Sequence, residues 1–402
     1  MKRIAIFCDG TWNLTDRKDQ QTNVVQLAQA VKLSADDGTK QVPIYVRGVG
    51  TGTGSNAFAR TTDKWLGGAL GWGLEKNIEQ AYKSLIFLYE PGDEIYIFGF
   101  SRGAYTARSL AGLIRKAGIL SRDNVHKISE AMALYRKRGK SGHPDADKVQ
   151  EKRAELSPEV ATSLDDLSKR DRATELLRIR YLGVWDTVGA LGLPGFLGLF
   201  ARIFNEKYAF HDTSLSSSVS AARHAVALDE RRKHYPPALW GNLEDLNMRK
   251  QRSVAPYQQI WFAGDHGSVG GGGEVRGLSA FTHGWIADGA IAEGLEMDAD
   301  RLANVAALCA PGDPVQNKPK PRLMQLVSTP LLQDREGPSE AMYVHESVLA
   351  KIRLGAANSG GPYHPGSLDK VWDELPGLLP QRSIAEETRQ EEEDDEVTPQ
   401  PS

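Results

Sequence analysis

The sequence has little cysteine, no long apolar run and no strong net charge, and each shortage narrows the class of protein. Two cysteines, Cys8 and Cys309, occur among 402 residues, too few for a disulfide framework and without metal-ligand spacing. The longest apolar stretch, residues 191–201, contains Pro194 and ends at Arg202, short of the roughly 20 residues of a membrane span. We therefore expect a cytoplasmic protein with no signal peptide, metal or cofactor; export by a signal-independent route stays open.

Acidity is concentrated near the carboxyl end of the chain. The net charge is −3, but residues 386–396 contain eight acidic residues and one arginine, which leaves the rest near +4. So weak a positive balance argues against a nucleic-acid partner. Residues 383–402 are polar and aperiodic, and we expect a disordered acidic tail; a tail that binds a partner is the alternative.

Short apolar runs alternate with segments of helical spacing. This alternation predicts an α/β fold with a mainly parallel sheet and helices on both faces. Strands are expected over residues 3–8, 41–47, 94–100, 179–185 and 259–263, with a weaker one over 225–228. Helical spacing covers residues 72–89 and 104–116. Residues 122–175 are strongly charged and mostly helical in pattern, so we expect an inserted segment there.

Chemically useful side chains follow the carboxyl ends of these expected strands. Asp9, Ser101, Asp186 and His266 each follow the carboxyl end of one, and open α/β sheets place their sites at that edge. Ser101 is the centre of a Gly-Phe-Ser-Arg-Gly motif between a strand and a helix, the setting of a nucleophile elbow. A serine hydroxyl needs a base, and the base needs an orienting group. We therefore predict Ser101 as nucleophile, His266 as base and Asp186 as acid, in the chain order of α/β-hydrolases.

Each of these roles has a structural alternative. The Ser101 motif also occurs as an ordinary turn, Asp186 also fits a strand-end turn or helix cap, and His266 also fits a hydrogen-bonded loop histidine. Asp265 would point away from His266 in an extended segment. Asp9 fits either the acid or a residue that shapes the neighbouring loop. The competing histidines are His211, His224, His234, His283 and, more distantly, His364.

An oxyanion hole is expected beside the serine. The backbone N–H of Arg102 provides one donor, and the Gly10–Thr11 loop provides the other, each donor being worth about 3–4 kcal/mol of barrier. Gly99 and Gly103 are expected to support the turn, because side chains at those positions would collide with neighbouring elements.

Four ordered blocks together resemble the signature of one family. They are residues 7–13, 99–108, 184–189 and 261–272, and residues 227–232 with Pro236 also fit. The family is that of α/β-hydrolase domains of unassigned function that includes the first class of type VI secretion phospholipase effectors. The resemblance covers residues 3–300 and implies a Ser–Asp–His triad on Ser101, Asp186 and His266. Its characterised secreted members attack fatty-acyl esters of membrane lipids and carry large membrane-engaging regions, so a toxin role for this shorter chain stays open.

The expected protein is a single α/β-hydrolase-like catalytic domain over residues 1–380 that cleaves carboxylic esters through an acyl-enzyme intermediate, with phospholipid as the leading substrate. Residues 189–218 are a candidate flap, and apolar residues 189–204 fit peripheral membrane contact; a core-packed loop is an equal alternative. Two rivals remain: a catalytically silent hydrolase-fold module that binds a partner, and a small-ester hydrolase without lipid preference. No motif identifies an immunity or delivery partner.

Overall fold

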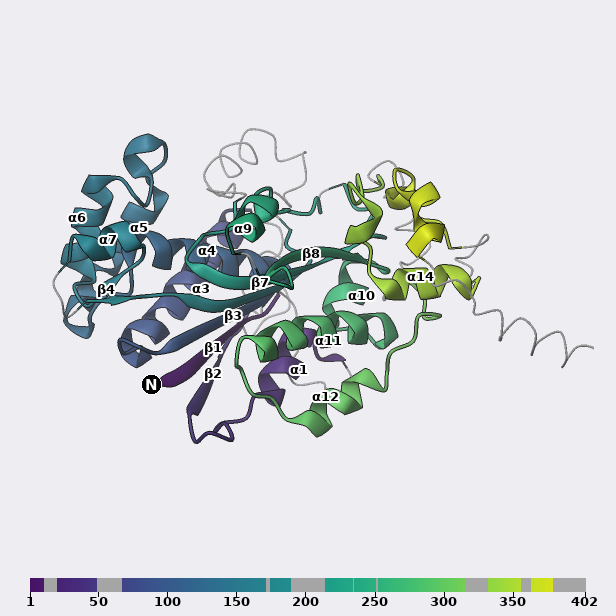
Figure 1. Ribbon diagram of the computed structural model, residues 1–402, viewed down its shortest axis with the longest axis horizontal. Coiled ribbons are helices and arrows are strands. Elements are labelled where there is room, and N and C mark those ends of the chain that lie inside the picture. Colours follow the sequence, from purple (N-terminus) through teal and green to yellow (C-terminus); the bar gives the residue numbers. More distant parts are fainter. Residues whose placement is uncertain are drawn as a thin grey trace, which may run out of the picture.

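One parallel sheet organises the molecule (Figure 1). The computed structural model describes residues 1–10, 20–48, 67–170, 174–188, 214–233, 235–250, 252–315, 332–355 and 363–378. Six strands lie in the order β2-β1-β3-β6-β7-β8, and every neighbouring pair is parallel. Their bounds are β1 Lys2–Cys8, β2 Lys40–Val46, β3 Glu94–Phe100, β6 Ile179–Trp185, β7 Val219–Ala227 and β8 Tyr257–Phe262.

The strand predictions differ from the structure mainly at β7. The strands expected over 94–100 and 179–185 have the bounds of β3 and β6. β7 begins six residues before the expected strand at 225–228. The prediction missed this first part because Arg223 and His224 interrupt the apolar pattern. The guanidinium of Arg223 stacks over the Trp285 ring, with 5.0 Å from Cζ to the ring centroid. Such contacts make polar side chains compatible with a central strand.

Helices cover both faces of the sheet, which confirms the expected fold class. Strand side chains alternate between the faces. Ile4 and Ile6 join one core with α3 and α4, whereas Ala5 and Phe7 join the other with α1 and α11. The bounds are α1 Asn23–Ala30, α3 Gly67–Leu88, α4 Arg102–Ala117 and α11 Gly277–Ala292. Sequence periodicity missed the short α1, which Thr22 caps by accepting from the Val25 amide.

The expected charged insertion folds as small helices against α4 (Figure 1). It consists of η2 Arg122–Lys127, α5 Ile128–Arg136, η3 Lys140–Gly142, α6 Asp147–Leu156, α7 Leu164–Ser168 and the strand pair β4 Val160–Ala161 and β5 Glu175–Leu176. The buried Arg153 fastens it: its Nε donates to Asp166 at 2.8 Å, and its Nη1 donates to the carbonyls of Arg115 and Lys116. The carboxyl end of α4 is thereby satisfied by a side chain of the insertion.

The last part of the chain covers the β8 edge of the sheet. After α9 Leu243–Lys250, α10 His266–Gly270 and α12 Ala299–Ala306 come η6 Ala341–Tyr343, α14 Glu346–Arg353, η7 Gly366–Leu368 and η8 Trp372–Leu378. Val344 bridges Trp261 in parallel, and the His345 amide donates to the Trp261 carbonyl at 2.9 Å. This pairing covers the β8 edge at Trp261. Within the described ranges, no helix combines the length and apolarity that a membrane crossing requires.

Candidate active site

Ser101 stands at a strained turn between β3 and α4. Its φ is 59° and its ψ is −123°, a region that L-residues rarely adopt. Its amide donates to the Trp185 carbonyl at 3.1 Å, which continues the β3–β6 pairing by one step. The serine is 9 % exposed. The turn therefore places a hydroxyl at the carboxyl edge of the sheet, with a helix amino terminus behind it.

The two flanking glycines permit close backbone approach at this turn. A Cβ on Gly99 would lie 2.4 Å from the Gly103 carbonyl oxygen, and a Cβ on Gly103 would lie 2.1 Å from that of Cys8. Neither obstacle is a side chain that can rotate away. Both positions thus require glycine for a steric reason within the folded elbow.

Asp186 and His266 form a close pair beside the elbow. Asp186 directly follows β6 and is also in a left-handed conformation, with φ 34°. Its Oδ2 lies 2.6 Å from His266 Nδ1, and the carboxylate is fully buried. The His266 ring lies against the Phe100 ring, with 4.7 Å between centroids, so it is beside the residue that precedes Ser101. Ser101 and His266 are both among the described residues, and no hydrogen bond joins His266 Nε2 to Ser101 Oγ.

Arg335 is a site residue that sequence reasoning missed. Its Nη1 donates to Asp186 Oδ1 at 2.6 Å, and its Nη2 donates to Asp186 Oδ2 at 3.1 Å. The same two nitrogens donate to the carbonyls of Ala227 and Tyr235, each at 2.8 Å. Burial opposes ionisation of Asp186, but Arg335 and then His266 hold the pKa of the carboxyl well below its ordinary range. No motif surrounds Arg335, so the sequence gives no signal that this arginine contacts Asp186.

Asp9 organises the loop after β1. Its carboxylate accepts from the Thr22 hydroxyl at 3.0 Å and the Tyr45 hydroxyl at 2.7 Å. It also accepts from the Gly10 amide at 2.7 Å, so that expected oxyanion donor is engaged by Asp9 here. Thr11, the other residue expected to contribute there, lies outside the described residues. Of the two interpretations of Asp9, these contacts favour the loop-shaping one.

The competing histidines have other surroundings. His224 is fully buried; its Nε2 accepts from the Thr187 amide, and burial together with Arg108 lowers its pKa to about 3. Burial also lowers the pKa of His283 to about 4, and His364 stacks on a tryptophan ring. His211 and His234 lie outside the described residues. Asp265 caps α10 by accepting from the Ser268 amide, as expected of a residue that does not orient His266.

The block at residues 227–232 holds the histidine loop. Asp229 accepts from the Gly264 amide at 2.6 Å and from the Tyr363 hydroxyl at 2.9 Å. Glu230 accepts from the His266 amide at 3.4 Å and pairs with Arg232 at 2.6 Å. These contacts hold the backbone at Gly264 and at His266, the candidate catalytic histidine.

A six-stranded parallel sheet with a serine elbow and a buried Asp–His pair at one edge defines an α/β-hydrolase-like protein. The family model described as T6SS, phospholipase effector Tle1-like, catalytic domain matches residues 2–289, and the chain belongs to that family. This confirms the resemblance seen in the sequence. Arg335 lies beyond the matched residues.

Individual relatives are more distant. The uncharacterized protein YEL023C of Saccharomyces cerevisiae is 32% identical over 239 residues, which are 58% of this chain and 31% of that protein. The chain thus spans less than a third of the length of this curated relative. A solved structure of an uncharacterized protein from Pseudomonas aeruginosa is 17% identical with a TM-score of 0.39, covering 76% of this chain and 48% of that one. The Tle1 effector bound to the VgrG spike of the type 6 secretion system is 16% identical with a TM-score of 0.34, covering 67% and 51%.

Proposed function

We propose that the protein hydrolyses carboxylic esters through an acyl-enzyme on Ser101, with phospholipids as the leading substrate class. The observation that carries the proposal is the 2.6 Å contact between Asp186 and His266 beside a serine in an elbow conformation. Membership of a phospholipase effector family supports the choice of ester class.

The proposed reaction begins with proton transfer. His266 Nε2 accepts the Ser101 Oγ proton as that oxygen attacks the ester carbonyl carbon, while Asp186 holds Nδ1–H and stabilises the imidazolium. Because Nε2 and Oγ are not hydrogen-bonded here, this contact must tighten when substrate binds, as is common in catalytic sites. The tetrahedral intermediate then expels the alcohol, which takes the proton from His266. Water attacks the acyl-serine with His266 again as base, releasing the acid and restoring Ser101.

The negative charge that develops on the carbonyl oxygen must be stabilised by hydrogen-bond donors. Arg102 is the first residue of α4, so its amide has no partner within the helix and is available to the oxyanion. The second donor in this proposal comes from the Gly10–Thr11 turn. Since Asp9 holds the Gly10 amide, the Thr11 amide is the better candidate of the two.

Fluorophosphonate labelling tests the nucleophile. The probe should modify Ser101 in the folded protein, and mass spectrometry of the digested adduct locates the site. Ser101→Ala should abolish labelling and lower ester turnover by a factor on the order of 10⁴ or more. Ser84→Ala, on the exposed side of α3, is the matched control and should label fully. An unlabelled Ser101, alongside a labelled reference hydrolase, would support the silent partner-binding module instead.

A second measurement separates a lipase from a small-ester hydrolase. Turnover of short- and long-chain esters should rise sharply once the substrate forms micelles if the enzyme works at a lipid interface. The candidate flap bears on this result, but residues 189–213 lie outside the described residues. Its final part is anchored, since the Leu215 amide donates to Asn242 at 2.7 Å. Equal turnover of monomeric and micellar ester would argue for the small-ester enzyme.

A further inference from the structure

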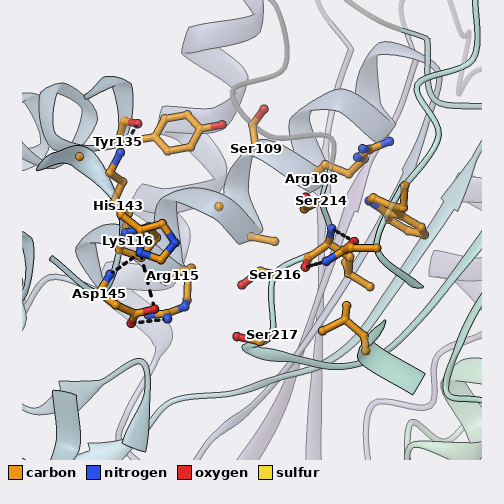
Figure 2. A pocket seen from close by; sticks show the side chains of 18 of the residues that line it. Arg108, Ser109, Arg115, Lys116, Tyr135, His143, Asp145, Ser214, Ser216 and Ser217 are labelled. Carbon is orange, nitrogen blue, oxygen red and sulfur yellow. Dashed lines mark hydrogen bonds and ion pairs between the residues drawn. The ribbon is translucent and has the colours of Figure 1, made fainter. Parts of the chain in front are cut away.

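A basic cavity lies beside α4, away from the proposed chemistry (Figure 2). Its volume is about 550 Å³, and its walls are α4, the insertion, residues 214–217 and residues 240–249. Among the described residues that line it, six are Lys or Arg and one, Asp145, is a carboxylate. The six are Arg108, Arg115, Lys116, Lys137, Arg138 and Arg249.

The carboxylate of Asp145 already has a cationic partner. It pairs with Arg115 at 2.6 Å, at the end of the cavity where Figure 2 also shows Lys116 and His143. Arg108 and Arg138 have interactions of their own. The other three cations lie on separate elements: Lys116 on α4, Lys137 in the loop after α5, and Arg249 on α9. No carboxylate of the described lining pairs with these three, so the fold concentrates positive charge here. Such a concave cationic surface attracts anions.

Lys116 is a buried cation of this cavity. It is 7 % exposed, and its Nζ donates to the carbonyls of Tyr135, at 3.2 Å, and Lys137. Within the described ranges it has no carboxylate partner. Burial and the charge of Lys137 lower its pKa to about 8. An ammonium has three donors, so one remains for a ligand oxygen, and an anion there would offset the desolvation.

Two further features of the lining favour a phosphate ester over a bare ion. Ser109 is 2 % exposed, and its hydroxyl has no hydrogen-bond partner within the described part of the chain. A buried hydroxyl without a partner is costly, and a phosphate or ester oxygen would satisfy it. Trp240 and Leu182 add apolar wall, which suits the organic part of a ligand. The cavity is also far larger than a single phosphate group.

We propose that this basic cavity binds a phosphate ester, with the phosphate at the end formed by Lys116 and Lys137 and the organic part toward Ser109 and Trp240. The proposal is independent of the chemistry of Ser101, because Lys116 lies 15 residues along α4, about 22 Å of helix, from that serine. A soluble phosphorylated compound and a phospholipid head group share this chemistry, and the experiment distinguishes them.

Binding is measured on the full chain carrying Ser101→Ala, which prevents turnover. Glycerol 3-phosphate is titrated by calorimetry, and vesicles of phosphatidylcholine with or without phosphatidic acid are tested by co-sedimentation. Lys137→Gln with Arg249→Gln, both at exposed positions, should weaken binding roughly tenfold or more. The matched control is Lys140→Gln with Lys250→Gln, which removes the same charge from neighbouring residues outside the lining and should change binding less than about twofold.

Ser109→Ala gives an independent readout. Loss of a buried hydroxyl without a partner should leave thermal stability unchanged or raised, while binding of glycerol 3-phosphate weakens about fivefold. Cavity-dependent binding of glycerol 3-phosphate alone assigns a soluble ligand; cavity-dependent binding of phosphatidic acid vesicles assigns a head group. Either result supports the proposal. Absence of binding by both probes, or equal weakening in the charge-matched control, overturns it.

Discussion

Asp186 contacts both His266 and Arg335, and this double contact determines how the candidate triad can be tested. Its Oδ2 accepts from both His266 and Arg335, and its Oδ1 accepts from Arg335 and from the Ala227 amide. The carboxylate is therefore fixed in orientation. Its charge is shared with a guanidinium, however, which reduces the stabilisation available to a protonated His266. Arg335 is in this sense a positioning residue.

Replacing either member of the Asp186–Arg335 pair alone should destabilise the fold. Asp186→Asn leaves a buried guanidinium without its counterion, and Arg335→Met leaves a buried carboxylate short of donors, so each should cost about 3–5 kcal/mol in urea unfolding. The double variant should recover much of that loss, because no unpaired charge remains. A loss of activity in Asp186→Asn alone would therefore combine a loss of stability with the removal of the candidate acid.

The control for this cycle is Arg231→Gln. Arg231 pairs with Asp334 at 2.7 Å, but both side chains are about half exposed, so the change should cost less than about 1 kcal/mol. Arg335→Met carries a second readout: removal of its positive charge should move the acid limb of the pH–rate profile to higher pH. Additive single losses together with an unmoved profile would show that Arg335 does not act through Asp186.

Among the elements, the elbow depends on the close approach of α4 to the end of β1. The Cys8 and Asp9 carbonyl oxygens would lie 2.1 and 2.6 Å from a Cβ at position 103. The same approach brings the first turn of α4 beside Asp9. In the proposed mechanism, packing and catalysis therefore depend on the same contact.

Gly103→Ala tests that dependence. The added methyl meets backbone atoms that cannot rotate away, so we expect a loss of at least about 2 kcal/mol in stability and a larger relative loss in turnover. Gly284→Ala on α11 is the matched control. Nothing lies within 4 Å of its added Cβ, so the change should stabilise the helix by up to about 1 kcal/mol. A fully stable and active Gly103→Ala protein would contradict this account of the elbow.

Across the whole molecule, the segment after residue 331 ties the distant parts of the site together. Arg335 reaches Asp186 from this segment, and Tyr363 reaches Asp229, which also holds the Gly264 amide before His266. Val344 pairs with the β8 edge at Trp261. The acid and the histidine loop are thus both held by residues outside the stretch that matches the family.

The Asp229 contact makes stability depend on pH. Burial raises the pKa of Asp229 from 3.8 to about 6, although the Gly264 amide and Tyr363 oppose the shift. The folded protein therefore holds this proton more tightly than the unfolded chain. The resulting stabilisation is complete below about pH 4 and is lost as the pH rises through 6, a change on the order of 1–3 kcal/mol.

Asp229→Asn should flatten this dependence between pH 4 and 6.5 in urea unfolding, since Asn retains an acceptor for Gly264 or Tyr363 but does not titrate. Asp36→Asn, at a side chain 81% exposed, should retain the pH profile of the unmodified protein. The account fails if the two variants show the same profile.

The sequence by itself determined the sheet, the elbow and the order of the candidate triad. Apolar runs, helical spacing and flanking glycines are local signals, and Ser101, Asp186 and His266 each lie shortly after a strand that those signals reveal. Local signals did not predict the full length of β7, where polar side chains interrupt the apolar pattern. They also did not predict α1, which is too short to show a clear helical period.

Only the tertiary structure decided what surrounds those residues. Arg335 is 149 residues from Asp186 along the chain, and an arginine in an aperiodic segment has no signal for its partner. The cations of the basic cavity lie on separate elements, so their shared environment exists only after packing. Pairing, burial and charge balance depend on distances in space, which the sequence encodes through the whole fold rather than through any motif.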